Sequence, residues 1–341
     1  MIALISNNLL TLSQFMEKYL SDLYTMSTYA IKAPSSHNTQ PWLIFIKDNG
    51  FEIYPDFSNP LPIADNSNRE LYISLGCAIE NICLAANEKG YGEALTFIQN
   101  ENQQISVRID LSKGTANPSA LFSQISKRQT NRSVFFDREI PEKEITKLTN
   151  LKMDEGIKHF IYKYNDTEFN LIRSFVREAN EIQLADDRYK DELLNWIRFS
   201  TSQINQFQNG LSYKTLGASI IPPFLRKIII RSQLKASAQN KADEKRMQTS
   251  SHFVLFTCEN NTPREWIKLG RSLQRFLLQT CKMKIASGFL NQPCEVEVIA
   301  DKMKDCLQIE NRHPAILLRI GYAHPVAYSP RKQASSFIFN K

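Results

Sequence analysis

The sequence lacks the short motifs that mark several common classes of enzyme. No G-x-G-x-x-G or G-x-x-x-x-G-K-[ST] string occurs, so the fingerprints of Rossmann dinucleotide binding and of P-loop phosphate binding are absent. The five histidines are scattered, without an H-E-x-x-H spacing or a His/Cys cluster, so we expect no metal site. No G-x-S-x-G elbow accompanies the adjacent Ser35, Ser36 and His37, which argues against a Ser/His hydrolase.

Paired cysteines and long apolar runs are missing as well. The six cysteines form no C-x-x-C pair and most lie in apolar stretches, a pattern typical of reduced, buried thiols in a cytosolic protein. The sequence contains no run of about 18 apolar residues, so it predicts no membrane-spanning segment. The N-terminus has neither a basic leader nor a small-residue cleavage site. We therefore expect a cytoplasmic protein with no membrane partner.

The net charge is positive, but the basic residues are dispersed. The chain has 42 Lys and Arg against 35 Asp and Glu, which gives +7, and acidic and basic residues alternate through most of its length. Only residues 226–246 are locally rich in Lys and Arg. A solvated helix or a mobile flap explains this segment about as well as a binding patch does, so we expect no nucleic-acid partner.

The length of 341 residues suits two related units of about 150 residues each. Periodicity predicts a helix over 8–32, a hairpin turning at 48–50, a buried helix closed by Gly90 and two further strands. The second unit is predicted to begin near residue 118, with a helix over 118–127. The other predictions for this unit are a helix from Pro141, helical structure over 166–205 and a surface insertion over 206–250. Two buried strands with a buried helix between them follow, and the second of these strands is predicted to be the terminal one.

Two of the predicted helices resemble each other. The segments that begin at Gly76 and Gly270 share a glycine start, a leucine-rich face and a closing glycine, which indicates a faint internal repeat. The sequence therefore predicts an α+β fold with an N-terminal half over 1–117 and a C-terminal half over 118–341.

Three polar strings are candidates for ligand binding. In P-S-S-H-N-T-Q-P-W (34–42), the amides of Asn38 and Gln40 offer donors and acceptors to a planar polar ligand. The alternative interpretation of this string is an ordinary proline turn after a helix. In K-R-Q-T-N-R (127–132), two arginines and a threonine suit a phosphate monoester, unless the string is a solvated basic turn. In N-Q-P-C-E (291–295), the proline predicts an extended chain with free backbone N–H groups.

Taken together, these strings resemble the FMN-dependent nitroreductase family. A-P-S-S-H-N-T-Q-P-W is similar to that family's P-S-S-x-N-x-Q-P-W loop, R-Q-T-N-R to its R-x-S-x-R element, and N-Q-P-C-E to the loop beside the flavin ring. The first half has the P-S-S-H-N-T-Q-P-W string, here called the serine loop (34–42), but no arginine element upstream of it. The second half has the arginine element (128–132) but no serine loop downstream. The likeness is closest to the Acg-type branch, in which one chain resembles a fused dimer with one flavin site.

The resemblance implies a mostly antiparallel sheet packed by helices in each half, with one FMN at their interface and residues 206–250 as a lid. It implies an NADH- or NADPH-dependent oxidoreductase that transfers hydride through flavin N5 to a small acceptor, without a catalytic side chain, as a monomer or a homodimer. Gln129 and Val296 depart from the family pattern. The alternative is a non-catalytic protein that sequesters FMN. The implied flavin-binding residues are Ser35, Ser36, His37, Asn38, Arg128, Gln129, Thr130, Arg132, Pro293, Cys294, Glu295 and Arg331.

Overall fold

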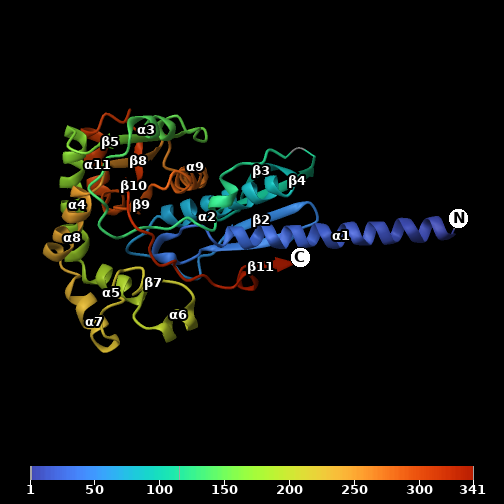
Figure 1. Cartoon of the computed structure of the whole chain (residues 1–341), viewed down its shortest axis with the longest axis horizontal. Helices are drawn as coiled ribbons and strands as arrows, with labels where there is room; N and C mark the ends of the chain where they lie inside the picture. The colour runs from blue at the N-terminus through green and yellow to red at the C-terminus, as the bar shows by residue number, and fades with distance from the viewer. Residues whose placement is uncertain (1, 115, 341) are drawn as a thin grey trace.

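The computed structural model describes residues 2–114 and 116–340 and contains two main sheets with helices packed on and between them (Figure 1). Among the described residues, no helix is long and apolar enough to cross a membrane. The predicted α+β class with mostly antiparallel sheets is confirmed. The helices are α1 (Ile2–Ala30), α2 (Arg69–Glu88), α3 (Glu142–Thr149), α4 (Thr167–Ala185), α5 (Asp187–Asn195), α6 (Thr201–Phe207), α7 (Pro223–Ser232), α8 (Ala236–Gln248), α9 (Pro263–Lys282), α10 (Gln292–Glu295) and α11 (Glu297–Cys306).

The first sheet has the strand order β11-β1-β2-β4-β3. Its strands β1 to β4 form two antiparallel hairpins, and alternate residues of β1 are buried because only one face of this strand meets the core. The last strand, β11, joins the edge in parallel with β1. The bounds are β1 (Trp42–Lys47), β2 (Gly50–Pro55), β3 (Tyr91–Gln99), β4 (Ile105–Lys113) and β11 (Ile338–Asn340).

The second sheet is antiparallel, with the order β5-β8-β10-β9. All seven residues of β8 are buried, since α9 packs against one face of the sheet while α4, α10 and α11 cover the other. This double cover explains why β8 and β10 read as uninterrupted apolar runs in the sequence. The bounds are β5 (Ile157–Lys163), β8 (His252–Cys258), β9 (Ala286–Phe289) and β10 (His313–Gly321).

Helices α2 and α9 pack against each other between the two sheets and carry the repeated glycines. A Cβ atom on Gly76 would lie 2.1 Å from the Ile267 carbonyl oxygen, and one on Gly270 would lie 2.0 Å from the Ile73 carbonyl oxygen. Gly76 thus contacts Ile267, three residues before Gly270, and Gly270 contacts Ile73, three residues before Gly76. The contact is therefore locally two-fold symmetric. The matching strings are I-S-L-G at 73–76 and I-K-L-G at 267–270.

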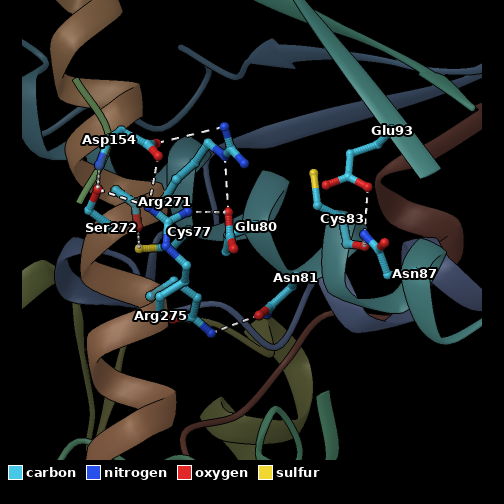
Figure 2. Close-up of polar contacts among 12 residues, drawn as sticks. Cys77, Glu80, Asn81, Cys83, Asn87, Glu93, Asp154, Arg271, Ser272 and Arg275 are labelled. Atoms are coloured by element: carbon cyan, nitrogen blue, oxygen red, sulfur yellow. Dashed lines mark hydrogen bonds and ion pairs between the residues drawn. The ribbon is translucent and has the colours of Figure 1, made fainter. Parts of the chain in front are cut away.

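A buried ion cluster joins the same two helices to the loop before β5 (Figure 2). The carboxylate of Glu80 on α2 accepts from Arg271 Nε at 3.0 Å and from Arg275 Nη1 at 2.9 Å, both on α9. Arg275 also donates to Asp154 at 2.7 Å. Because the charges compensate one another, the helices approach closely without leaving any of these four ions unpaired.

Several predicted elements differ from the structure. Residues 118–127 contain only a 3-10 turn, Phe122–Gln124, because the chain bends here to bring the following arginines inward. The continuous helical structure predicted over 166–205 is broken into α4, α5 and α6, with the short strand β6 (Ile197–Arg198) between the last two. Cys306 is exposed rather than buried.

The predicted surface insertion, 206–250, is more ordered and less peripheral than expected. It contains β7 (Leu211–Ser212), which pairs with β6, and helices α7 and α8. Helix α8 packs against α4, and Met247 at its end lies in the core of the second half. The sequence misses this role because much of the contact between the two helices is polar: Asn180 Nδ2 on α4 donates to Asn240 Oδ1 at 2.9 Å and to Asp243 Oδ2 at 3.0 Å on α8.

Strand β10 was expected to be the terminal strand, but the chain continues past it to β11 on the first sheet. Phe337, buried just before β11, packs its ring 6.0 Å from that of Trp42. The C-terminal tail therefore links the two sheets.

Candidate functional site

A cavity of about 420 Å³ lies between the halves and is bounded by both. This volume falls within the range of small-molecule sites, roughly 300–1,000 Å³. Both apolar and polar side chains line it. The apolar lining comprises Ile73, Cys77, Ile125, Leu211, Leu273, Phe289 and Ile316. Of the twelve site residues expected from sequence, ten line this cavity: Ser35, Ser36, His37, Asn38, Arg128, Gln129, Thr130, Arg132, Glu295 and Arg331.

Three arginines face the cavity without a carboxylate partner among the described residues. Arg128 is 6% exposed; its Nη2 donates to the Lys32 carbonyl at 3.2 Å, while Nε and Nη1 have no partner. Arg331 donates to the carbonyls of Lys32 and Ala33 and to the side chain of Asn38. Buried cations with unused donors carry a large desolvation cost, which an anionic ligand would offset.

Burial also perturbs the protonation of these arginines. It lowers the pKa of Arg128, and together with neighbouring Arg246 it lowers the pKa of Arg132 to about 10. Burial and the charge of Arg128 lower the pKa of Arg331 to about 9. All three remain cationic at neutral pH, so the cavity lining carries positive charge.

The serine loop adopts an unusual backbone conformation. His37, Asn38 and Gln40 have φ angles of 45°, 57° and 58°, a left-handed region that non-glycine residues rarely occupy. The Ser35 hydroxyl accepts from the Gln40 N–H at 3.0 Å and closes the loop. The structure therefore supports a built loop rather than an ordinary proline turn, since such strain persists only when surrounding contacts hold it.

The amides of Asn38 and Gln40 are not free to bind a ligand edge, contrary to the prediction. Asn38 Nδ2 donates to the carbonyls of Gly210 and Pro330, at 3.2 and 2.9 Å. Gln40 Nε2 donates to the Gln208 carbonyl at 2.9 Å, and its Oε1 accepts from the Lys332 N–H at 3.0 Å. Both amides hold the 208–210 segment and the C-terminal tail against the serine loop, and Gln40 does not line the cavity.

The predicted extended conformation around Pro293 is wrong. Residues Gln292–Glu295 form the short helix α10, with the proline in its first turn, where the missing N–H costs nothing. The N–H groups of Cys294 and Glu295 both donate to the Asn291 carbonyl, so they are not free for a ligand. Pro293 and Cys294 are buried and do not line the cavity, whereas Glu295 does.

Gln129 departs from the basic residue of the family pattern, and its side chain has a structural role here. Its Nε2 donates to the Val326 carbonyl at 2.5 Å and its Oε1 accepts from the Val326 N–H at 3.0 Å. Gln129 thus holds the tail strand beside the arginines. Val296, the other departure, packs against the core of the second half rather than lining the cavity.

Two carboxyl groups also line the cavity, the buried Glu70 and the partly buried Glu295, and sequence reasoning missed Glu70. Glu70, at the start of α2, lies within hydrogen-bonding reach of Glu295. Burial first, and the charge of Glu295 second, raise the pKa of Glu70 to about 8. Asn291 Nδ2 donates to Glu70, and Gln183 Nε2 donates to Glu295 at 2.7 Å. At neutral pH the carboxyl group of Glu70 therefore keeps its proton.

Comparisons with known proteins give distant similarities. No family model matches the sequence. The chain is similar to "Putative NAD(P)H nitroreductase Rv3131" of Mycobacterium tuberculosis, with 21% identity over 324 residues that cover 92% of this chain and 90% of the relative. It is also similar to "Uncharacterized protein Rv3127" of the same organism, with 24% identity over 310 residues covering 88% and 87%. Among solved structures, the FMN-dependent nitroreductase NfnB from Mycobacterium smegmatis aligns with a TM-score of 0.41 and 15% identity, over 62% of this chain and 94% of that one.

Proposed function

We propose that the chain binds one FMN in the central cavity and is a nitroreductase-like oxidoreductase of the Acg type, in which two related halves form one flavin site. The observation that carries this proposal is the set of three arginines without carboxylate partners, with two unused donors on Arg128. Distant similarity to a relative named as an NAD(P)H nitroreductase supports the choice of flavin among anionic ligands.

The lining residues fit such a ligand in its chemistry. Arg128, Arg132, Thr130 and Arg331 would hold the phosphate and the ribityl chain, since guanidinium and hydroxyl groups suit phosphate oxygens. The apolar side chains of the lining would pack against the flat ring system. The locally two-fold contact between α2 and α9 supports the fused-dimer relationship of the halves.

When bound, FMN would accept a hydride from NADH or NADPH and pass two electrons to a small acceptor. The chain's own residues contribute binding and protonation. Glu70 holds a proton on a carboxyl group that lines the cavity, and Asn291 fixes the orientation of that carboxyl. The Glu70–Glu295 pair is therefore able to supply one proton to an acceptor bound beside it.

A specific observation keeps the sequestering alternative open. The segment that supplies Leu211 to the cavity wall is hydrogen-bonded to the serine loop through both Asn38 and Gln40. A cover fixed in this way would restrict the access of a nicotinamide to the cavity. The two functions share their binding residues and differ only in turnover.

The experiment has two stages. In the first, the Arg128→Ala/Arg132→Ala variant should purify colourless, with FMN affinity at least about 100-fold lower than wild type, because charge-assisted hydrogen bonds are lost. The matched control is Arg138→Ala, an exposed arginine of the same segment, which should keep the flavin band. A yellow double variant would contradict the phosphate assignment.

The second stage mixes the yellow wild-type protein anaerobically with NADH and, separately, with NADPH. Rapid bleaching of the flavin band followed by its return on adding a quinone or a nitroaromatic compound supports the oxidoreductase. A flavin that dithionite reduces and both nicotinamides leave oxidised assigns the chain to FMN sequestration.

A further inference from the structure

Helix α7 and the turn before it expose an unusual amount of apolar surface. Ile220 is 94% exposed, Phe224 77% and Ile228 65%. Phe224 and Ile228 are four residues apart, so they lie on one face of the helix. Large apolar side chains that gather on one exposed face mark an interaction surface more often than isolated ones do.

One arginine of this helix faces the other way. Arg226 is buried; its Nε donates to the Ile221 carbonyl at 2.8 Å and its Nη1 to the Phe199 carbonyl at 3.2 Å. Its guanidinium also lies 3.8 Å from the centre of the Tyr213 ring. The orientation of α7 is thus fixed by a buried cation, which leaves the apolar face directed outward.

Positive charge borders the apolar face. Lys227 and Arg231 are exposed on α7, three residues after Phe224 and Ile228 respectively, and therefore border the apolar stripe. The sequence contains no Asp or Glu anywhere between residues 193 and 242. Within that span the exposed basic residues are Lys214, Lys227, Arg231, Lys235 and Lys241.

The helix is also separate from the candidate flavin site. None of its residues lines the cavity. In Figure 1, α7 lies at the lower edge of the molecule, at the end of the group formed with α5 and β7 and away from the second sheet. A flat or extended partner could therefore reach this face without entering the cavity.

We propose that α7 and the turn at 220–223 dock the protein on the surface of a membrane that contains anionic phospholipid. Exposed Ile and Phe would insert at the level of the headgroups, and the flanking lysines and arginine would meet lipid phosphates, as in other interfacial basic helices. The apolar stripe bordered by Lys227 and Arg231, with no acidic residue on α7 itself, favours an anionic surface. This proposal replaces our sequence-based expectation of no membrane partner, which rested on the absence of a spanning segment.

Flotation of the whole protein with lipid vesicles tests the proposal. The wild-type protein should float with vesicles of phosphatidylcholine and phosphatidylglycerol and stay at the bottom with phosphatidylcholine alone. Phe224→Ser/Ile228→Ser and Lys227→Glu/Arg231→Glu should each lower the partition coefficient at least about 30-fold, from lost apolar burial and lost charge attraction respectively. Higher salt should weaken binding of the wild type.

Two controls match these changes elsewhere on the surface. Val298→Ser removes a side chain that is 54% exposed on α11, and Lys143→Glu/Lys147→Glu reverses two charges four residues apart on α3; both should float like the wild type. Retained flavin and an unchanged circular dichroism spectrum show that the α7 variants are folded. Equal flotation with neutral vesicles, or equal loss in the controls, overturns the proposal. So does a wild type that stays at the bottom but forms a dimer that Phe224→Ser/Ile228→Ser dissociates.

Discussion

At the scale of single residues, the cavity lining combines charges of both signs. Among the described residues, its arginines have no carboxylate partner and its two glutamates accept no hydrogen bond from an arginine. Ion pairs between these arginines and glutamates would compensate both charges. In the fold, however, Arg128 donates to the Lys32 carbonyl and Glu70 accepts from the Asn291 side chain. The unsatisfied electrostatics therefore remain available to a ligand, which is a common feature of functional sites.

The raised pKa of Glu70 predicts a pH-dependent stability. In the unfolded chain this carboxyl ionises near its ordinary value of about 4.5, and in the folded protein near 8. The folded state thus binds one more proton between these values, so the stability that Glu70 contributes is present at low pH and lost as pH rises toward 8. We expect a loss of about 1.4 kcal/mol per pH unit in this window.

Glu70→Gln should remove that slope, because the amide resembles the protonated carboxyl and keeps an oxygen for Asn291. Denaturant unfolding at pH 5.5, 6.5 and 7.5 would measure the difference between variant and wild type. Glu88→Gln, at the exposed end of the same helix, is the control and should keep the wild-type slope. Parallel curves for the wild type and Glu70→Gln would show that Glu70 is ionised at neutral pH.

Sequence reasoning found the arginines of the cavity and missed Glu70. Arg128 and Arg132 stand in a recognisable string, R-Q-T-N-R, so a motif exposes them. Glu70 stands at the start of a helix, where an acidic residue is expected for helix stability alone. Only folding brings it to Glu295, 225 residues further along the chain, and no local pattern records that contact.

At the scale of elements, the contact between α2 and α9 depends on two glycines. At both positions a methyl group would overlap a backbone carbonyl of the other helix, and backbone cannot move aside as a flexible side chain can. The buried ions of Glu80, Arg271 and Arg275 require the same close approach. The geometry of the whole interface between the halves is therefore set at this point.

Gly76→Ala should destabilise the protein by about 3 kcal/mol or more, although alanine favours an isolated helix by roughly 1 kcal/mol. The free energy of unfolding from denaturant titration measures the loss. Glu88→Ala raises helix propensity on the same helix without touching α9, so its effect should stay within about 0.5 kcal/mol. A Gly76→Ala variant as stable as the wild type would mean that the helices are free to move apart.

Elements with a strong period were predictable, and elements that depend on distant packing were not. The hairpin of β1 and β2, the central helices and the buried strand β8 follow the expected patterns. Helix α10 was predicted as an extended chain because Pro293 fits both the first turn of a helix and an extended segment. Strand β11 is only three residues long and exists because β1 offers it an open edge.

At the scale of the whole molecule, the C-terminal tail joins the halves and completes the cavity. After β10 it passes the arginines of the second half, where Val326 pairs with Gln129 and Arg331 faces the cavity. It then crosses to the serine loop, where Lys332 is held by Gln40, and ends as β11 on the first sheet. Anchoring at β11 and positioning of Arg331 are therefore coupled.

The anchor of this tail is Phe337, which is 1% exposed and packs on Trp42. Phe337→Ala should cost about 3–5 kcal/mol in the free energy of unfolding, because it leaves a cavity beside a buried ring. It should also weaken flavin retention, since the tail that carries Arg331 loses its fixed end. Phe339→Ala, two residues later and 39% exposed, is the matched control and should change both quantities much less.

Denaturant unfolding and titration of the flavin-free protein with FMN would measure the two effects separately. If Phe337→Ala lowers stability but leaves FMN affinity at the wild-type value, Arg331 is held by Asn38 and the carbonyls of Lys32 and Ala33 alone. A parallel loss of stability and FMN affinity would show that β11, on the first sheet, controls the position of Arg331, which follows the last strand of the second sheet in the sequence.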